Sequence, residues 1–176
     1  IVSLEKLEIV YPVNEYKVFV ALSSYKQNRI RTRLYHKIKQ KGYSCANYIC
    51  STAKIWPSVK IGENCCVMDF CVAEPNAIIG DNVTLFHGTF IGHNSSIGNN
   101  CWIVCSVISG LVIMGENCFI GANSAIADSI VMEDDCFVTI GSAVNKNCSK
   151  GGIYAGNPAR KRKVNVYRMF KIPEKS

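Results

Sequence analysis

A six-residue period in the middle of the chain sets the strongest limit on how it can fold. Stepping by six from Ile49 reaches a large aliphatic residue at nine of ten positions up to Ile103. After one irregular stretch the series resumes at Met114 and continues to Val144. An α-helix requires a period near 3.6 residues and an amphipathic strand a period of 2. The pattern therefore predicts a repeat architecture.

Two further regularities define that repeat. A small residue usually lies four positions after each aliphatic one, and glycine often follows the aliphatic residue directly, as at Gly62 and Gly80. Three short strands per coil, joined by tight corners, would place the aliphatic side chains on a common axis and the small ones near the corners. Gly and Asn would give the corners their backbone freedom. We predict a left-handed parallel β-helix of hexapeptide repeats over residues 49–148.

The two ends of the chain lack the period. Lys17 to Leu22 resembles a buried strand, and residues 28–40 resemble a basic helix that Ser23 or Ser24 precedes and that ends before Gly42. We therefore expect residues 1–48 to be a partial α/β segment, similar to half of a nucleotide-sugar-binding domain. Because the chain begins with Ile1, we expect further sequence upstream. Residues 149–176 should form a C-terminal cap and basic tail.

Charge and cysteine content narrow the class of protein. The net charge is +7, but the acidic middle lies between two basic ends, which fits a phosphate-bearing small ligand better than nucleic acid. No apolar run is long enough to span a membrane and no export signal begins the chain, so we expect a cytoplasmic protein. The ten cysteines include no C-x-x-C pair, and five occupy the small-residue position of the repeat, as free thiols would. We expect no metal site.

Histidine is the residue type best suited to act as a catalytic base in this sequence. Acyl transfer needs a base for the nucleophile and donors for the developing oxyanion, and imidazole titrates near neutral pH. His87 and His93 each follow an axial residue by two positions, so both should face outward from successive faces of one coil. His36 lies on the expected basic helix, where a surface position is expected. The pattern alone leaves open whether His87 and His93 are catalytic or merely exposed.

The series of aliphatic residues breaks once. Ile103 to Met114 is eleven steps, one short of two repeats, and the displaced segment contains Ser109 and Gly110. Such a slip either turns a backbone amide towards a cleft or is a deletion without functional consequence. The pattern alone favours the deletion.

Four segments add a more specific signature: VTLFHGTFIGHNSSIG at 83–98, the Ser-Gly pair at 109–110, MGENCFIGANSAI from Met114, and GNPAR at 156–160. Together they resemble sugar O-acyltransferases of the sialic-acid O-acetyltransferase type, a family that also includes N-acetyltransferases of nucleotide-linked amino sugars. The resemblance covers residues 17–163. It implies an acetyl-CoA-dependent acetyltransferase that transfers directly to an amino or hydroxyl group of a sugar or nucleotide-linked sugar.

The resemblance also implies roles for particular residues. His93 matches the general base, and Asn94 stands where relatives often carry an acidic residue or His. Gly110 matches a glycine whose amide contacts the thioester carbonyl. Similar proteins are homotrimers that bind acetyl-CoA between neighbouring prisms. The positions implied for the pantetheine arm and then for the phosphates are Gly121, Ala122, Gly141 and Ser142, followed by Lys146, Arg160 and Lys161.

The sequence alone determines neither the identity of the acceptor nor the choice between the competing functions. His87, Glu74 and Asp69 are candidates for lining the acceptor end. The Gly-rich turn with which the family binds nucleotide sugars does not occur in this chain. A non-catalytic scaffold or sugar-binding module remains an alternative. A zinc hydratase of the carbonic-anhydrase kind would need three histidine ligands, of which His87 and His93 supply two.

Overall fold

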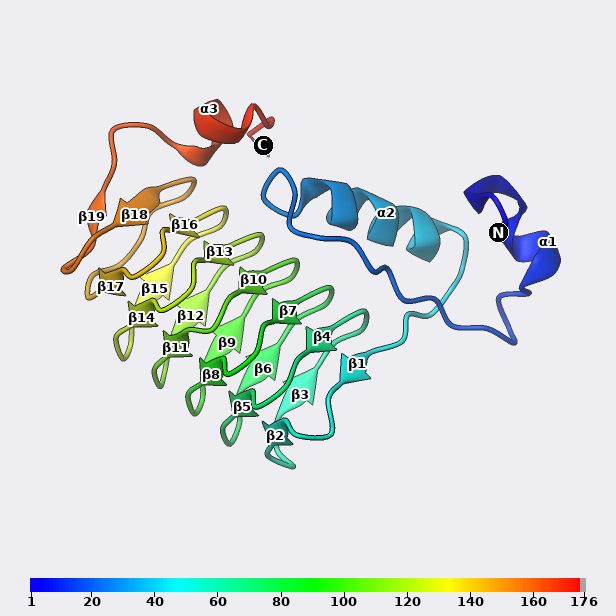
Figure 1. Ribbon diagram of the computed structural model, residues 1–176, viewed down its shortest axis with the longest axis horizontal. Coiled ribbons are helices and arrows are strands. Elements are labelled where there is room, and N and C mark those ends of the chain that lie inside the picture. The colour runs from blue at the N-terminus through cyan, green and yellow to red at the C-terminus, as the bar shows by residue number, and fades with distance from the viewer. Residues whose placement is uncertain (175–176) are drawn as a thin grey trace.

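The computed structural model describes residues 1–174 and confirms the β-helix. The middle of the chain winds into stacked triangular coils, with a helical N-terminal segment lying along one side (Figure 1). Each coil contributes one two-residue strand to each of three parallel sheets. The N-terminal segment and the C-terminal helix lie near the same side of the stack (Figure 1).

Up to β17 the three sheets are built from strands three apart in the chain, and β18 and β19 then extend the first sheet. The first sheet contains β1 (Tyr48–Ile49), β4 (Cys66–Val67), β7 (Thr84–Leu85), β10 (Trp102–Ile103), β13 (Phe119–Ile120), β16 (Phe137–Val138), β18 (Ile153–Ala155) and β19 (Arg160–Lys161). The second contains β2 (Lys54–Ile55), β5 (Val72–Ala73), β8 (Phe90–Ile91), β11 (Val107–Ile108), β14 (Ala125–Ile126) and β17 (Ala143–Val144). The third contains β3 (Lys60–Ile61), β6 (Ile78–Ile79), β9 (Ser96–Ile97), β12 (Ile113–Met114) and β15 (Val131–Met132).

The aliphatic series forms the axis, as predicted. From Val67 to Val144 its members are buried in one continuous core, whereas Ile49, at the first coil, is exposed. The slip lies earlier than expected, because Ile108 is the buried axial residue between Ile103 and Met114. The corner after β10 is thus one residue short, and Val107, expected in the small position, faces outward instead.

Asparagine and glycine serve the corners in different ways. Asparagines such as Asn64, Asn82 and Asn100 adopt positive φ angles, which Asn tolerates better than most residues. The glycines that follow axial residues do not. A Cβ on Gly62 would lie 2.8 Å from the backbone nitrogen of Asp81 in the next coil. These glycines are therefore required by the close approach of successive coils rather than by backbone freedom, which corrects the expectation from sequence.

The edge between the third and first sheets, called here the asparagine edge, anchors the N-terminal segment. Side-chain amides join Asn64 to Asn82 at 2.7 Å and Asn82 to Asn100 at 2.8 Å. The buried Arg31 donates from Nε to Asn82 Oδ1 and from Nη2 to the carbonyl oxygen of Asn64, both at 2.7 Å. The first 48 residues are thus fixed to the β-helix by buried polar contacts.

The expected strand at Lys17–Leu22 is absent from the described residues. Val18 forms only an isolated parallel bridge with Cys45, and the backbone nitrogen of Val20 bonds to Asn64 Oδ1 at 2.8 Å. The segment therefore lies along an edge of the β-helix, where no further strand pairs with it. The N-terminal helices are η1 (Leu4–Lys6), α1 (Leu7–Val10) and α2 (Arg29–Gln40).

Helix α2 confirms the predicted basic helix and its bounds, expected at residues 28–40 with Ser23 or Ser24 before the start. Asn28 is its N-cap, with a φ of 64°, and donates its side-chain amide to the carbonyl oxygen of Asn100 instead of capping the helix. Gly42 follows the helix end with a φ of 90°. His36 is exposed on α2, as expected.

The C-terminal residues close the far end of the stack. β19 pairs antiparallel with β18, and the short helix α3 (Val166–Phe170) packs back towards the first sheet. All ten cysteines are free, and the five in the small position are buried. Burial raises the pKa of the Cys65 thiol to about 11. Within residues 1–174 no helix is both long and apolar enough to cross a bilayer.

Candidate functional site

His93 lies on the edge between the second and third sheets, called here the His93 edge. It follows β8, its side chain is exposed, and its backbone nitrogen donates to Glu74 Oε2 of the preceding coil at 3.0 Å. Glu74, expected at the acceptor end, is therefore a direct neighbour of His93. The pattern's prediction of an outward-facing imidazole is confirmed.

Gly110 lies against the imidazole of His93. A Cβ added at Gly110 would be 2.7 Å from His93 Nε2 and 2.8 Å from Cε1, so the ring occupies space that any other residue would fill. The amide of Gly110 donates to Asp128 Oδ1 at 2.9 Å. Gly110 belongs to a corner of regular length, so the link drawn from sequence between the slip and this amide is wrong.

Asn94 contacts the other side of the His93 ring. Its Nδ2 lies 3.0 Å from His93 Nδ1, and its Oδ1 accepts from Asn76 Nδ2 at 3.2 Å. An amide nitrogen at Nδ1 places the proton of a neutral imidazole on Nε2. Rotating both amides by half a turn would reverse this tautomer without moving heavy atoms appreciably.

His87 lies on the edge between the first and second sheets, called here the His87 edge. Its Nδ1 is 2.8 Å from Asp69 Oδ2, and Cys50 donates its thiol to Asp69 Oδ1 at 3.0 Å. These bonds, led by that from Cys50, lower the pKa of the Asp69 carboxyl. His87 and Asp69 thus form a pair, on a different edge from Glu74 and His93. A metal site that uses both histidines is not formed within one chain.

The residues expected to hold the acyl donor also divide between the two edges. Gly121, Ala122, Gly141 and Ser142 stack on the His87 edge, where the Gly141 amide donates to the carbonyl oxygen of Ala122 at 2.8 Å. The basic residues Lys146, Arg160 and Lys161 line one depression of about 420 Å³. Lys146 is at the C-terminal end of the His93 edge, three coils beyond His93.

Two residues that bond to the neighbours of the histidines were missed from sequence. Asp128 lies on the His93 edge one coil beyond Gly110, and Cys50 lies on the His87 edge one coil before Asp69. Asp128 follows Gly110 by 18 residues, and Asp69 precedes His87 by 18. Because one coil takes three repeats, comparing positions 18 apart, rather than six, would have found the contacts of Gly110 with Asp128 and of His87 with Asp69, whereas Cys50 and Asp69 are 19 apart. Among residues 1–174 no cluster of three His, Cys, Asp or Glu side chains could hold a metal ion.

The fold and the repeats define the class of protein. Residues 58–93 match the bacterial transferase hexapeptide with six repeats, and residues 111–146 match the hexapeptide repeat of succinyl-transferase. The protein is thus a hexapeptide-repeat β-helix. Both models describe repeats found in transferases, and each matches 36 of the 176 residues.

Curated relatives match about two thirds of the chain. The bifunctional protein GlmU of Clostridium botulinum is 29% identical over 121 residues, which is 64% of this chain and 25% of GlmU. The chain therefore spans about a quarter of the length of these relatives.

Solved structures match over nearly the whole chain. One is a perosamine N-acetyltransferase from Caulobacter crescentus, with one histidine replaced by asparagine, in complex with CoA and GDP-perosamine. It is 25% identical with a TM-score of 0.85, over 92% of this chain and 76% of that one. The acetyltransferase domain of PglB from Neisseria gonorrhoeae has a TM-score of 0.84 at 22% identity, over 91% and 77%. The second likeness concerns the fold alone.

Proposed function

We propose that this protein is an acetyl-CoA-dependent acetyltransferase whose acceptor is an amino group on a nucleotide-linked sugar, with His93 as general base. The observation that carries the proposal is the exposed imidazole of His93, seated on Gly110 at the middle of the His93 edge. The likeness to an N-acetyltransferase that binds CoA and GDP-perosamine supports acetyl-CoA as the donor and a nucleotide-linked amino sugar as the acceptor.

In this mechanism His93 Nε2 takes a proton from the acceptor amine as its nitrogen attacks the thioester carbonyl. The C–N bond forms, the C–S bond breaks, and the departing thiolate receives a proton. Transfer is direct, with no acyl-enzyme. A basic Nε2 requires the proton on Nδ1, so Asn94 must turn its carbonyl oxygen towards Nδ1. The Gly110 amide must leave Asp128 before it can donate to the carbonyl of the thioester.

The donor path runs along the His93 edge towards its basic end. Successive coils are ~4.8 Å apart, so Lys146 lies roughly 15 Å beyond His93. An extended pantetheine arm could bridge that interval and bring its phosphates to Lys146, Arg160 and Lys161. Gly121, Ala122, Gly141 and Ser142 lie on the other edge, so one chain does not place all seven residues along a single path. We therefore propose a homotrimer, in which the His93 edge of one chain faces the His87 edge of the next.

The test is transfer by the intact protein with His93 or His87 replaced. Release of CoA thiol is measured with acetyl-CoA and a panel of nucleotide-linked amino sugars, free amino sugars and hydroxyl-only sugars. His93→Ala should lower kcat by about 10² to 10⁴ and leave acetyl-CoA binding largely intact. His87→Ala tests the other exposed histidine of the same coil, and His36→Ala, at an exposed position on α2, is the control.

The same assay separates the other possibilities. Turnover lost in His87→Ala and kept in His93→Ala would assign the base to the pair of His87 and Asp69. Asn94→Asp should move the acidic limb of the pH–rate profile to higher pH, because a carboxylate stabilises the imidazolium. Thiol release with hydroxyl acceptors alone would make the protein an O-acetyltransferase, and no release with any acceptor would refute the transferase function.

A further inference from the structure

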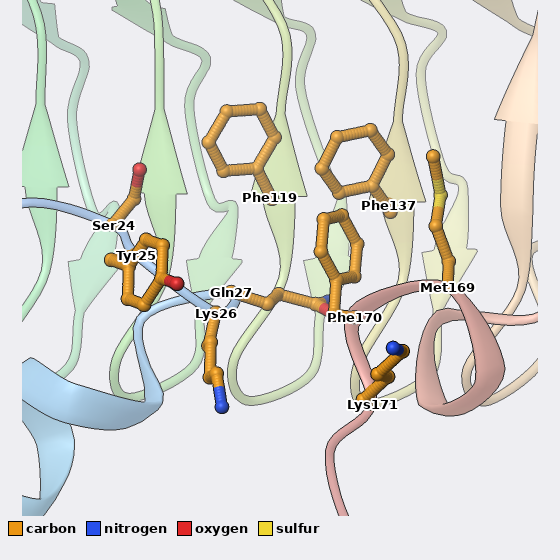
Figure 2. A pocket seen from close by; sticks show the side chains of 9 residues that line it. All are labelled: Ser24, Tyr25, Lys26, Gln27, Phe119, Phe137, Met169, Phe170 and Lys171. Atoms are coloured by element: carbon orange, nitrogen blue, oxygen red, sulfur yellow. The ribbon is translucent and has the colours of Figure 1, made fainter.

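An apolar cavity lies on the opposite side of the molecule from His93. It has a volume of about 530 Å³, which falls within the range of small-molecule sites. Its walls come from three parts of the chain: Ser24–Gln27 before α2, the aromatic residues of β13 and β16, and the end of α3. Figure 2 shows the side chains that line the cavity. Neither the proposed base nor the proposed donor path uses this cavity.

Phenyl rings form the inner wall. Phe119 and Phe137 are paired in register across β13 and β16, and their rings stack with centroids 4.7 Å apart and planes 7° apart. Phe170 of α3 joins them at 5.2 Å from Phe137. All three rings remain partly exposed. Such a column presents flat aromatic surface, on which a planar heterocycle stacks favourably.

Both walls are held by one buried carboxylate. Asp135 accepts from Arg29 at the start of α2 and from Tyr167 of α3, at 2.5 Å and 3.0 Å. Its side chain is only 1% exposed. Helix α3 is thereby tied to the N-terminal segment. The cavity is therefore a preformed feature of the folded chain.

Gln27 supplies an unused hydrogen-bond acceptor in the cavity wall. It is 3% exposed, and its Nε2 donates to the carbonyl oxygens of Asn117 and Asp135 at 3.2 Å and 3.0 Å. Since both partners are acceptors, the nitrogen is assigned by its contacts and the oxygen by exclusion. That Oε1 has no partner within the described residues. Because this oxygen is itself buried, the Gln27 side chain must shift before an amino or imino group of a ligand can reach it.

Cations line the outer side of the cavity. Lys26 and Lys171 lie across from Phe119 and Phe137 in Figure 2. An adjoining depression shares both lysines and adds Arg29 and Arg33. No Asp or Glu of the described residues lines either one. The rim therefore favours an anionic group attached to whatever stacks on the rings.

We infer that this cavity binds a nucleoside phosphate, with the base on the phenyl column and Gln27, and the phosphates on Lys26 and Lys171. The inference goes beyond the proposed function, because the cavity lies on the opposite side of the molecule from His93, and it does not depend on turnover. The adenosine end of CoA has the same chemistry. The two sources are told apart by the nucleotide that binds.

Calorimetric titration of the full chain with GDP, UDP and adenosine 3′,5′-bisphosphate tests the inference. We expect at least one to bind below millimolar concentration, and the double variant Lys26→Glu/Lys171→Glu to weaken it at least tenfold. Preference for GDP or UDP identifies a nucleotide of the sugar-linked kind as the ligand, and preference for the bisphosphate identifies the adenosine end of CoA. Lys163→Glu, an exposed position outside both cavities, is the control for charge.

Three outcomes would overturn the inference. The first is no binding of any of the three nucleotides at millimolar concentration. The second is binding that survives the double variant. The third is binding lost in Lys161→Glu alone, which would place the nucleotide beside Lys146. Acetyl transfer measured on the same preparations shows separately whether the proposed function holds.

Discussion

The imidazole of His93 owes its place to the absence of a side chain at position 110. The ring lies over Gly110 because nothing projects from the next coil at that point. Gly110 does not have a positive φ, so its backbone conformation is open to other residues. What demands glycine here is the volume of the imidazole.

Gly110→Ala should therefore impair catalysis more than folding. The new methyl group would meet Nε2 at 2.7 Å and push an exposed side chain aside. We expect kcat to fall by about tenfold or more, since small displacements of a catalytic group are costly, and the free energy of unfolding to change by less than about 1 kcal/mol. Enzyme kinetics and thermal unfolding measure the two effects.

Gly92→Ala is the contrasting variant. Its Cβ would lie 2.5 Å from the carbonyl carbon of Ser109, a backbone atom that cannot move aside. This change should lower Tm clearly. If Gly110→Ala kept full kcat, the position of the His93 ring would not matter to the reaction.

At the scale of elements, the asparagine edge holds the N-terminal segment through few but buried contacts. Arg31 of α2 reaches two coils at once. Burial lowers the pKa of its guanidinium. Removing this side chain leaves Asn82 Oδ1 and the carbonyl oxygen of Asn64 without a charged donor.

Arg31→Ala should accordingly loosen α2 while the β-helix stays folded. We expect a loss of about 2–4 kcal/mol in the local stability of the N-terminal segment. Native-state hydrogen exchange would show faster exchange for α2 amides and unchanged protection in the second sheet. Arg33→Ala, at an exposed position on the same helix, should alter stability by less than about 0.5 kcal/mol. Equal effects of the two changes would contradict this account.

The repeats could be predicted from sequence, whereas the contacts between coils could not. A six-residue period identifies the axial residues because each strand contributes one of them to the core. The prediction of a strand near Val18 was wrong, since an apolar run forms a strand only where a partner strand exists. The pairing of His87 with Asp69 depends on stacking of whole coils, and a period of six does not report it.

At the scale of the whole molecule, two sheets retain uncovered apolar side chains. Ile78, Ile113 and Val131 project outward from the third sheet, and Val107 from the second; all four are exposed. These residues flank the His93 edge. Ile113 and Val131 are partners in register, and exposed apolar side chains beside a candidate site support the proposed assembly of three chains.

We expect light scattering to give a mass of three chains for the native protein. Ile113→Lys would place a charge in the interface and should shift the protein towards monomer, with loss of transfer. Lys37→Glu, at an exposed position on α2, is the control and should leave the mass unchanged. A monomeric native protein with full activity would exclude a site shared between chains.

The short corner after β10 indicates where chains of this fold can gain or lose residues during evolution. Losing one residue there leaves every later strand in register with its neighbours, because the gap is absorbed where the backbone turns. Insertions and deletions at corners therefore leave the axial side chains in their stacked positions. Related chains of different length could for the same reason keep an identical cross-section.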